Sequence, residues 1–163
     1  MSHTNFKKSL IVRPALALVA LTTLTGLAAA GKCPADKIKD GAVTSGATAP
    51  VGVTDAVIAS INLSPKGGDF KDQLLRMRQL TIAPDGIVPW HEHSERPANI
   101  YVLSGTIEEY RAKSNVPIVH KAGEVASEFG KGFAHWWKNT GSEPVVLLSA
   151  DVFHTATADG HIM

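Results

Sequence analysis

The sequence predicts an all-β domain, a sandwich or a barrel, and three observations lead to that prediction. Short segments rich in apolar residues recur at close spacing from Val57 onward. Turn-forming clusters such as Pro84-Asp85-Gly86 and Asn139-Thr140-Gly141 separate them. No segment of useful length repeats its apolar residues with the period of an amphipathic helix. Many short strands separated by turns are typical of sandwiches and barrels.

The first 30 residues carry the pattern of a secretory signal peptide, which would be cleaved from the mature protein. Lys7, Lys8 and Arg13 form a basic start, an apolar run covers residues 15–27, and three alanines at 28–30 are suited to cleavage. The run has 13 residues, whereas a membrane-spanning helix needs about 20. We therefore expect a periplasmic or secreted protein without a stable membrane anchor.

Residues 31–55 are rich in Gly, Ala, Thr, Ser and Pro and show no apolar period, which indicates a flexible or extended arm. Cys33 is the only cysteine, so the chain cannot form an intramolecular disulfide. Cleavage after Ala30 would leave 13 basic and 15 acidic residues, and no run of basic residues favours nucleic acid. The remaining residues, 56–163, are expected to form one domain.

The expected strands follow one another with little between them. Their ranges are 57–63, 75–83, 87–93, 98–103, 106–111, 117–119, 124–128, 135–138 and 145–153. Pro84-Asp85-Gly86 is expected to close the second strand, and Ser104-Gly105 to form a tight turn. Arg76 and Arg78 alternate on the second strand, where the sequence leaves open whether they line the interior or face solvent.

Three histidines form the candidate metal site. His91 and His93 are two residues apart on an expected strand, so their side chains point to the same side of it. His135 follows on a later strand. Neutral imidazole is a good ligand for first-row transition metals. The pattern therefore predicts one divalent metal, with Fe, Mn, Ni, Cu and Zn all left open.

These residues resemble the cupin superfamily, whose motifs run G-x5-H-x-H-x3,4-E-x6-G and G-x5-P-x-G-x2-H-x3-N. The corresponding positions here are Gly86, His91, His93, Gly105, Gly123, Gly132, His135 and Asn139. Four residues rather than five separate Gly86 from His91, and six rather than five separate Gly123 from Gly130. The resemblance covers residues from about 75 to 153. It implies a single-domain, cupin-type jelly-roll β-barrel that holds the metal near one mouth, and it also suggests a homodimer paired through outer strands.

The chain departs from the motif at the metal itself. The motif glutamate falls at Ala98, which cannot bind metal, and the motif proline falls at Gly130. The resemblance therefore implies three histidine ligands without the usual fourth. Some oxygen-using cupins are similar in holding iron with three histidines alone, which leaves positions open for substrate and oxygen.

Other residues near the motif are weighed by strand parity. Glu92 points away from its neighbouring histidines. Glu95 has their parity but lies in a turn, so it is either a solvated charge or a group near the metal or substrate. Arg96 is either a surface residue or an inward group suited to an anionic substrate. Trp137 has the parity of His135 and is either a pocket residue or a large core or interface side chain, whereas Trp136 is expected to face an outer sheet or a partner.

Two functions remain open from the sequence. The first is a metal-dependent, oxygenase-like enzyme that acts on a small molecule, with Glu95 or Arg96 orienting the substrate. The second is a non-catalytic module that binds a metal or a small ligand. An open coordination sphere favours the enzyme, because catalytic metal sites keep a vacancy. A metal-free structural barrel is a third alternative.

Overall fold

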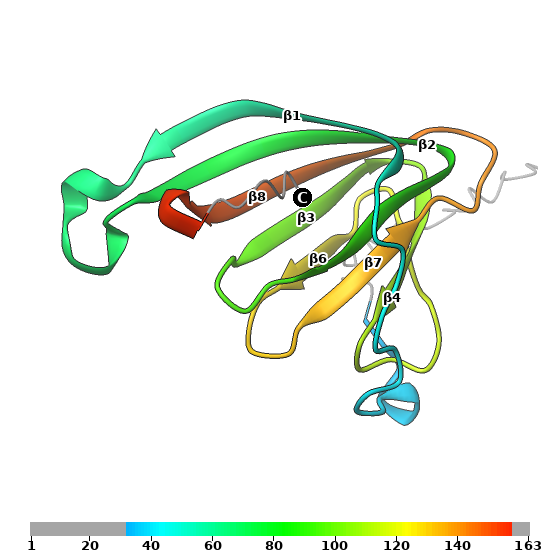
Figure 1. Cartoon of the computed structure of the whole chain (residues 1–163). Coiled ribbons are helices and arrows are strands. Elements are labelled where there is room, and N and C mark those ends of the chain that lie inside the picture. Colours follow the sequence, from blue (N-terminus) through cyan, green and yellow to red (C-terminus); the bar gives the residue numbers. More distant parts are fainter. Residues whose placement is uncertain (1–31, 158–163) are drawn as a thin grey trace, which may run out of the picture.

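The computed structural model describes residues 32–157, and it confirms the all-β jelly-roll architecture (Figure 1). The strands are β1 (Val51–Asn62), β2 (Gln73–Glu92), β3 (Ala98–Ser104), β4 (Thr106–Arg111), β5 (Ile118–Lys121), β6 (Val125–Glu128), β7 (Ala134–Lys138) and β8 (Val145–His154). Single 3-10 turns lie at Ala35–Lys37, Ser64–Lys66, Gly68–Phe70 and Thr155–Thr157. The expected signal peptide lies outside the described residues.

The strand β2 joins the two halves of the barrel. One of its edges pairs with β1, and the other pairs first with β8 over residues 73–82 and then with β7 over residues 87–92. The strand order β5-β4-β7-β2-β8-β3-β6 therefore curls into a nearly closed barrel, and β3 contacts β5 across it. Figure 1 shows the strands curving around this interior.

Alternating burial along the strands defines the interior. In β3 and β5 every second side chain is buried and the others are exposed, as expected for strands with one face on a core. Apolar side chains of several strands meet in one cluster. Its members include Leu80, Ile82, Val88, Ile100, Val102, Ile107, Trp137, Val145 and Leu147.

The turn expected at Pro84-Asp85-Gly86 does not end a strand. It is a bend within β2, which runs for 20 residues. Asp85 adopts a left-handed φ of 58°, and a Cβ on Gly86 would lie 2.7 Å from the carbonyl oxygen of Ala83. The backbone therefore turns sharply there while its pairing continues, which brings the last residues of β2 onto β7.

The segment expected to be an arm follows the barrel closely. The backbone N–H of Lys39 donates a hydrogen bond to the Lys113 carbonyl, and the N–H of Trp90 donates to the Ala47 carbonyl. The strand β1 already begins at Val51, so the boundary expected at residue 55 does not coincide with a structural boundary. Backbone pairing of this kind leaves no apolar period, which is why the sequence did not indicate it.

The outer face near Trp136 is covered by the chain itself. The indole stacks on Tyr110 with ring centroids 4.1 Å apart, and a Cβ on Gly46 would lie 2.4 Å from it. Trp136 is thus partly covered by the chain itself and partly exposed, and its role in an interface stays a prediction. Exposed apolar side chains gather instead on the β1–β2 hairpin, at Val57, Ile58, Ile61, Leu75 and Met77. Within residues 32–157, no helix has the length and apolar character needed to cross a membrane.

Candidate metal centre

The structure brings His91, His93 and His135 together inside the barrel. His91 lies on β2, His93 just beyond its end, and His135 on β7, where it pairs directly with His91. The ring centroids are 4.6 to 5.0 Å apart in all three pairs. One ligand atom from each ring lies within 4.8 Å of the others. The site predicted from the sequence is therefore a compact cluster of three imidazoles.

Hydrogen bonds fix which ring nitrogen each histidine turns inward. Nδ1 of His91 donates to the Pro89 carbonyl at 2.8 Å, and Nδ1 of His93 donates to the Arg96 carbonyl at 2.8 Å. Nδ1 of His135 bonds the Glu109 carboxylate at 2.6 Å. Because these acceptors need a proton on each Nδ1, neutral rings carry a lone pair on every Nε2. A neutral ring in this tautomer is the form that binds metal.

The electrostatic surroundings keep two of the rings neutral. Burial, together with the charges of His135 and His93, lowers the pKa of His91 well below its usual value. Burial and His135 lower the pKa of His93 to about 3. At neutral pH these two imidazoles are therefore unprotonated, and no proton has to leave them before a metal binds.

A buried carboxylate, Glu109 of β4, supports His135 from behind. It also accepts hydrogen bonds from His120 and, through both oxygens, from Arg111. Burial alone would raise the pKa of Glu109, but the hydrogen bonds from His120, His135 and Arg111 outweigh it and hold the pKa well below its usual range. Glu109 is thus an ionised anchor for a ligand, a role that the sequence reading missed.

A second buried carboxylate, Glu128 of β6, faces the histidines directly. Its Oε2 lies 3.1 Å from Nε2 of His93, and its Oε1 lies 3.7 Å from Nδ1 of His135. Burial raises the pKa of Glu128 to about 7 despite the opposing charge of His135. The sequence reading missed this residue too, although strand parity with the buried Ala126 offered a signal.

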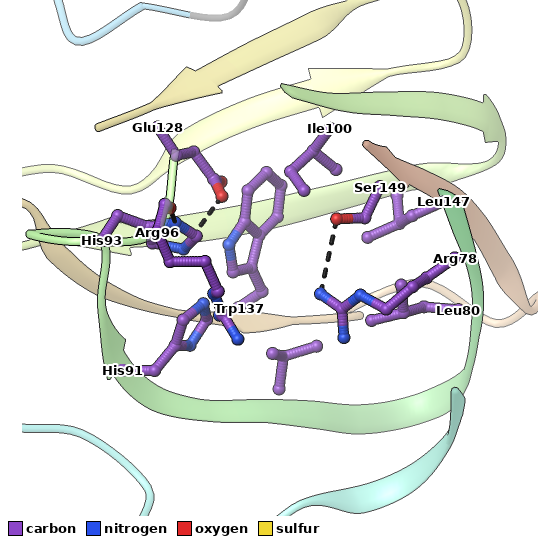
Figure 2. Close-up of a pocket in the computed structure, with 11 residues that line it drawn as sticks. Arg78, Leu80, His91, His93, Arg96, Ile100, Glu128, Trp137, Leu147 and Ser149 are labelled. Atoms are coloured by element: carbon purple, nitrogen blue, oxygen red, sulfur yellow. Dashed lines mark hydrogen bonds and ion pairs between the residues drawn. The ribbon is translucent and has the colours of Figure 1, made fainter. Parts of the chain in front are cut away.

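Two of the three other candidates for substrate contact line the cavity, and Glu95 is the solvated charge that the sequence left as one alternative. Arg96 and Trp137 both line the cavity beside the histidines (Figure 2). The Arg96 side chain is only 15% exposed, and its Nε lies 4.0 Å from Asp151. Glu95 is exposed on the turn and is not part of the cavity lining. Arg78 also lines the cavity, beside apolar side chains such as Leu80 and Ile100.

The donor set fits a transition metal. Metal–nitrogen bonds of about 2.0–2.1 Å place neighbouring ligand atoms about 2.8–3.4 Å apart in octahedral or tetrahedral sites. Nε2 of His91 and Nε2 of His135 are 3.2 Å apart, close enough for a hydrogen bond or for two neighbouring ligands of one metal. Nε2 of His93 is buried and has no hydrogen-bond partner in the described chain. A shared cation satisfies all three atoms.

Comparisons with known proteins agree with this geometry. A family model for the cupin domain matches residues 78–151, a range that contains the three histidines. No curated protein matches the chain at a significant level.

Similar solved structures include three proteins of low sequence identity. A predicted oxalate decarboxylase from Thermotoga maritima has a TM-score of 0.50 and 15% identity, over 75% of this chain and 98% of that one. A protein with a double-stranded β-helix domain from Klebsiella pneumoniae has a TM-score of 0.48 and 21% identity, over 64% and 76%. A cupin domain from Schizosaccharomyces pombe has a TM-score of 0.49 and 15% identity, over 65% and 68%. The motif residues, the jelly-roll barrel and the family match lead to one conclusion: residues 78–151 of this chain form a cupin domain.

Proposed function

We propose that this cupin binds one divalent transition metal through Nε2 of His91, His93 and His135 and uses it in an oxygenase-like reaction on a small anionic molecule. The observation that carries the proposal is the shared orientation of the rings. Each Nδ1 is held by an acceptor, so each Nε2 presents a lone pair to the same point. Three protein ligands leave coordination positions free for a substrate.

The charge beside the histidines favours an anionic substrate. The Arg96 side chain reaches into the cavity between His91 and His93 (Figure 2), and its Nε has no hydrogen-bond partner in the described chain. A guanidinium group binds a carboxylate through two parallel hydrogen bonds. Arg96 would therefore hold a carboxylate of the substrate next to the metal, in the orienting role that strand parity had suggested.

Each part of the cavity has a separate task in this proposal. A bound metal supplies Lewis acidity and, if it is iron, manganese or copper, redox chemistry toward dioxygen. The apolar wall formed by Leu80, Val88 and Trp137 limits access of water to the bound substrate. His135 is kept in place by Glu109, so the ligand geometry is set before the substrate arrives.

The test is metal content followed by oxygen uptake. The protein is purified without chelator or histidine tag, beside a His91→Gln/His93→Gln double variant, and its metals are measured. We expect near one equivalent in the native protein and none in the variant. The loaded protein is then given iron(II), air and a series of small mono- and dicarboxylates. Catalytic oxygen consumption that is lost in Arg96→Gln, with metal content retained, supports the enzyme.

Other results would contradict specific parts of the proposal. No metal in the native protein, even after reconstitution, overturns the metal site. One equivalent of metal and tight binding of a carboxylate, without oxygen uptake or product for any carboxylate, overturns the oxygenase and leaves the non-catalytic binding module. Equal activity in Arg96→Gln overturns the role of that arginine.

We also propose that the protein is exported to the periplasm or the medium. The support is the order of the basic start, the apolar run at residues 15–27 and the alanines at 28–30. The full chain is expressed in a bacterium, and its location and N-terminus are determined. We expect an extracytoplasmic protein that begins at Gly31. A cytoplasmic protein with an intact N-terminus would overturn the proposal.

A further inference from the structure

The fold places a glutamate opposite the position where the motif lacks one. Ala98 of β3 stands where cupins carry the glutamate ligand, and its direct partner in the antiparallel β3–β6 ladder is Glu128. Directly opposite residues project to the same side, with Cβ atoms about 4.5–5.5 Å apart. The Glu128 side chain therefore starts about one strand spacing from the expected carboxylate and enters the same interior.

The carboxylate of Glu128 approaches the side of His93 that binds metal. Its Oε2 lies 3.1 Å from Nε2, while Nδ1 on the far side of the ring donates to the Arg96 carbonyl. Figure 2 shows the two groups facing each other. A carboxylate that only positioned the ring would bond Nδ1, as Glu109 does for His135. Contact with Nε2 places Glu128 next to the position of the metal.

The atoms in this contact also need a proton or a metal ion between them. The Glu128 side chain is almost completely buried, and Nε2 of His93 and Oε1 of Glu128 have no hydrogen-bond partner within residues 32–157. An unpaired buried carboxylate and a lone pair aimed at it are both costly. Their separation of 3.1 Å falls within the range of about 2.8–3.4 Å expected for neighbouring ligands of one metal.

We propose that Glu128 is the fourth protein ligand of the metal, donated from β6 in place of the glutamate that is absent at Ala98. This inference depends on the three-histidine site proposed above. The relocated carboxylate gives the site an anionic oxygen ligand, which favours harder ions such as manganese(II) and iron(II) over the preference of histidines alone. It also leaves two positions of an octahedral ion for the substrate and a second small ligand.

The experiment moves the carboxylate back to its usual strand. Cobalt(II) and manganese(II) binding to the metal-free full chain is measured by calorimetry, and the visible spectrum of the cobalt form reports its coordination. Removal of an outer partner already weakens metal binding about 10–100-fold, so we expect Glu128→Ala to weaken it at least about 100-fold. The double variant Ala98→Glu/Glu128→Ala nearly conserves side-chain volume, and we expect it to regain most of the affinity and the native cobalt spectrum.

Two further variants test whether Glu128 binds the metal or only fills space beside it. Glu128→Gln keeps the shape and hydrogen-bonding capacity of the side chain but binds metal poorly, so it should behave like Glu128→Ala. Glu124→Gln, just before β6, should match the native protein, because its carboxylate bonds the Lys121 N–H instead. Circular dichroism of each metal-free variant checks that it is folded.

The outcomes distinguish this inference from the metal site itself. A native protein that binds no metal overturns both proposals. A native protein and Glu128→Ala that bind one equivalent with equal affinity and identical cobalt spectra overturn the role of Glu128 alone. Weaker binding in Glu128→Ala with no recovery in the double variant also overturns relocation, provided that the double variant is folded.

Discussion

Nδ1 of His135 lies 2.6 Å from Oε1 of Glu109, and neither side chain is exposed to solvent. The hydrogen bond connects β7 to β4, whose backbones are paired alongside it. Arg111 and His120 bond the same carboxylate, so its charge is balanced without a metal. Glu109 therefore fixes the orientation and the tautomer of the His135 ring from the side away from the metal. Glu128 instead approaches Nε2 of His93, the nitrogen that faces the metal position.

Replacing Glu109 by Gln should weaken metal binding about tenfold or more, since partners of this kind typically contribute 10–100-fold to affinity. The amide oxygen can still accept the hydrogen bond from His135, but the negative charge that raises the basicity of the ring is gone. Calorimetry with zinc(II) or manganese(II) measures the change. Glu108→Gln on the same strand is the matched control, because that side chain bonds Tyr110 instead. Unchanged affinity in Glu109→Gln would contradict the orienting role.

The metal-free protein should lose stability as the pH falls below about 6.5. His91 and His93 have folded-state pKa values below their usual 6.5, so the unfolded chain binds two protons there that the folded chain does not. Glu128, with its pKa raised from 4.5 to about 7, opposes them by one proton in the folded state. The net excess of one proton in the unfolded state corresponds to a loss of about 1.4 kcal/mol per pH unit near pH 5.5.

Glu128→Gln isolates the opposing proton. In this variant the unfolded chain binds two more protons than the folded chain. The free energy of unfolding should then fall by about 2.7 kcal/mol per pH unit. Urea unfolding of the chelator-treated proteins at several pH values between 7.5 and 5 gives both slopes. Parallel curves for the native protein and the variant would show that Glu128 takes up no proton on folding.

Much of this site follows from sequence, because strand parity and motif spacing act locally. His91 and His93 are two residues apart, so an extended backbone through them aims both rings to the same side. His135 needed the motif, since only the fold brings β7 beside β2. Trp137 and Arg96 line the cavity on the side that their parity indicated.

The carboxylates were missed because their positions depend on pairing between strands. Glu128 matters only because β6 pairs with β3 in the register that sets it opposite Ala98, and no local pattern encodes that register. Glu109 depends in the same way on the pairing of β4 with β7. The bend in β2 was not predicted for a different reason. Pro84-Asp85-Gly86 is typical of a turn, and the sequence does not distinguish a turn that ends a strand from a bend within one strand.

Replacing Asp151 by Asn should destabilise the barrel strongly. This buried carboxylate of β8 receives two hydrogen bonds from Arg76, at 3.0 and 2.6 Å, and lies 3.6 Å from Arg78 and 4.0 Å from Arg96. Its loss would remove the carboxylate that these three arginines share, while Asp55 stays bonded to Arg78. We expect a decrease of about 3–5 kcal/mol in the free energy of unfolding, as for other broken buried ion pairs.

Denaturant unfolding measures this decrease. Asp69→Asn is the control, because Asp69 is exposed on the 3-10 turn Gly68–Phe70, and it should stay within about 0.5 kcal/mol of the native protein. If Asp151→Asn lowers the free energy by less than about 1 kcal/mol, the arginines do not depend on Asp151 for their charge balance.

Asn139 should prove to be a structural residue, although it belongs to the motif that carries His135. Its Nδ2 lies within 3.1 Å of the carbonyls of Ile82, Ala83 and Glu143, and its Oδ1 accepts the N–H of Gly141. The side chain thus ties the bend of β2 to the turn between β7 and β8. It is fully buried, so Asn139→Ala would leave several of these groups unsatisfied, and we expect a loss of about 2–4 kcal/mol in the free energy of unfolding.

The same variant should still bind one equivalent of metal. The histidines are aligned by the direct pairing of His91 with His135, which does not pass through Asn139, so affinity should change less than that in Glu109→Gln. Thermal unfolding and calorimetry on the same sample compare the two effects, with Thr140→Ala, an exposed neighbour, as the control. A loss of metal without a loss of stability would instead place Asn139 at the site, because only a group that acts on the metal directly can lower affinity while leaving the folded barrel as stable as before.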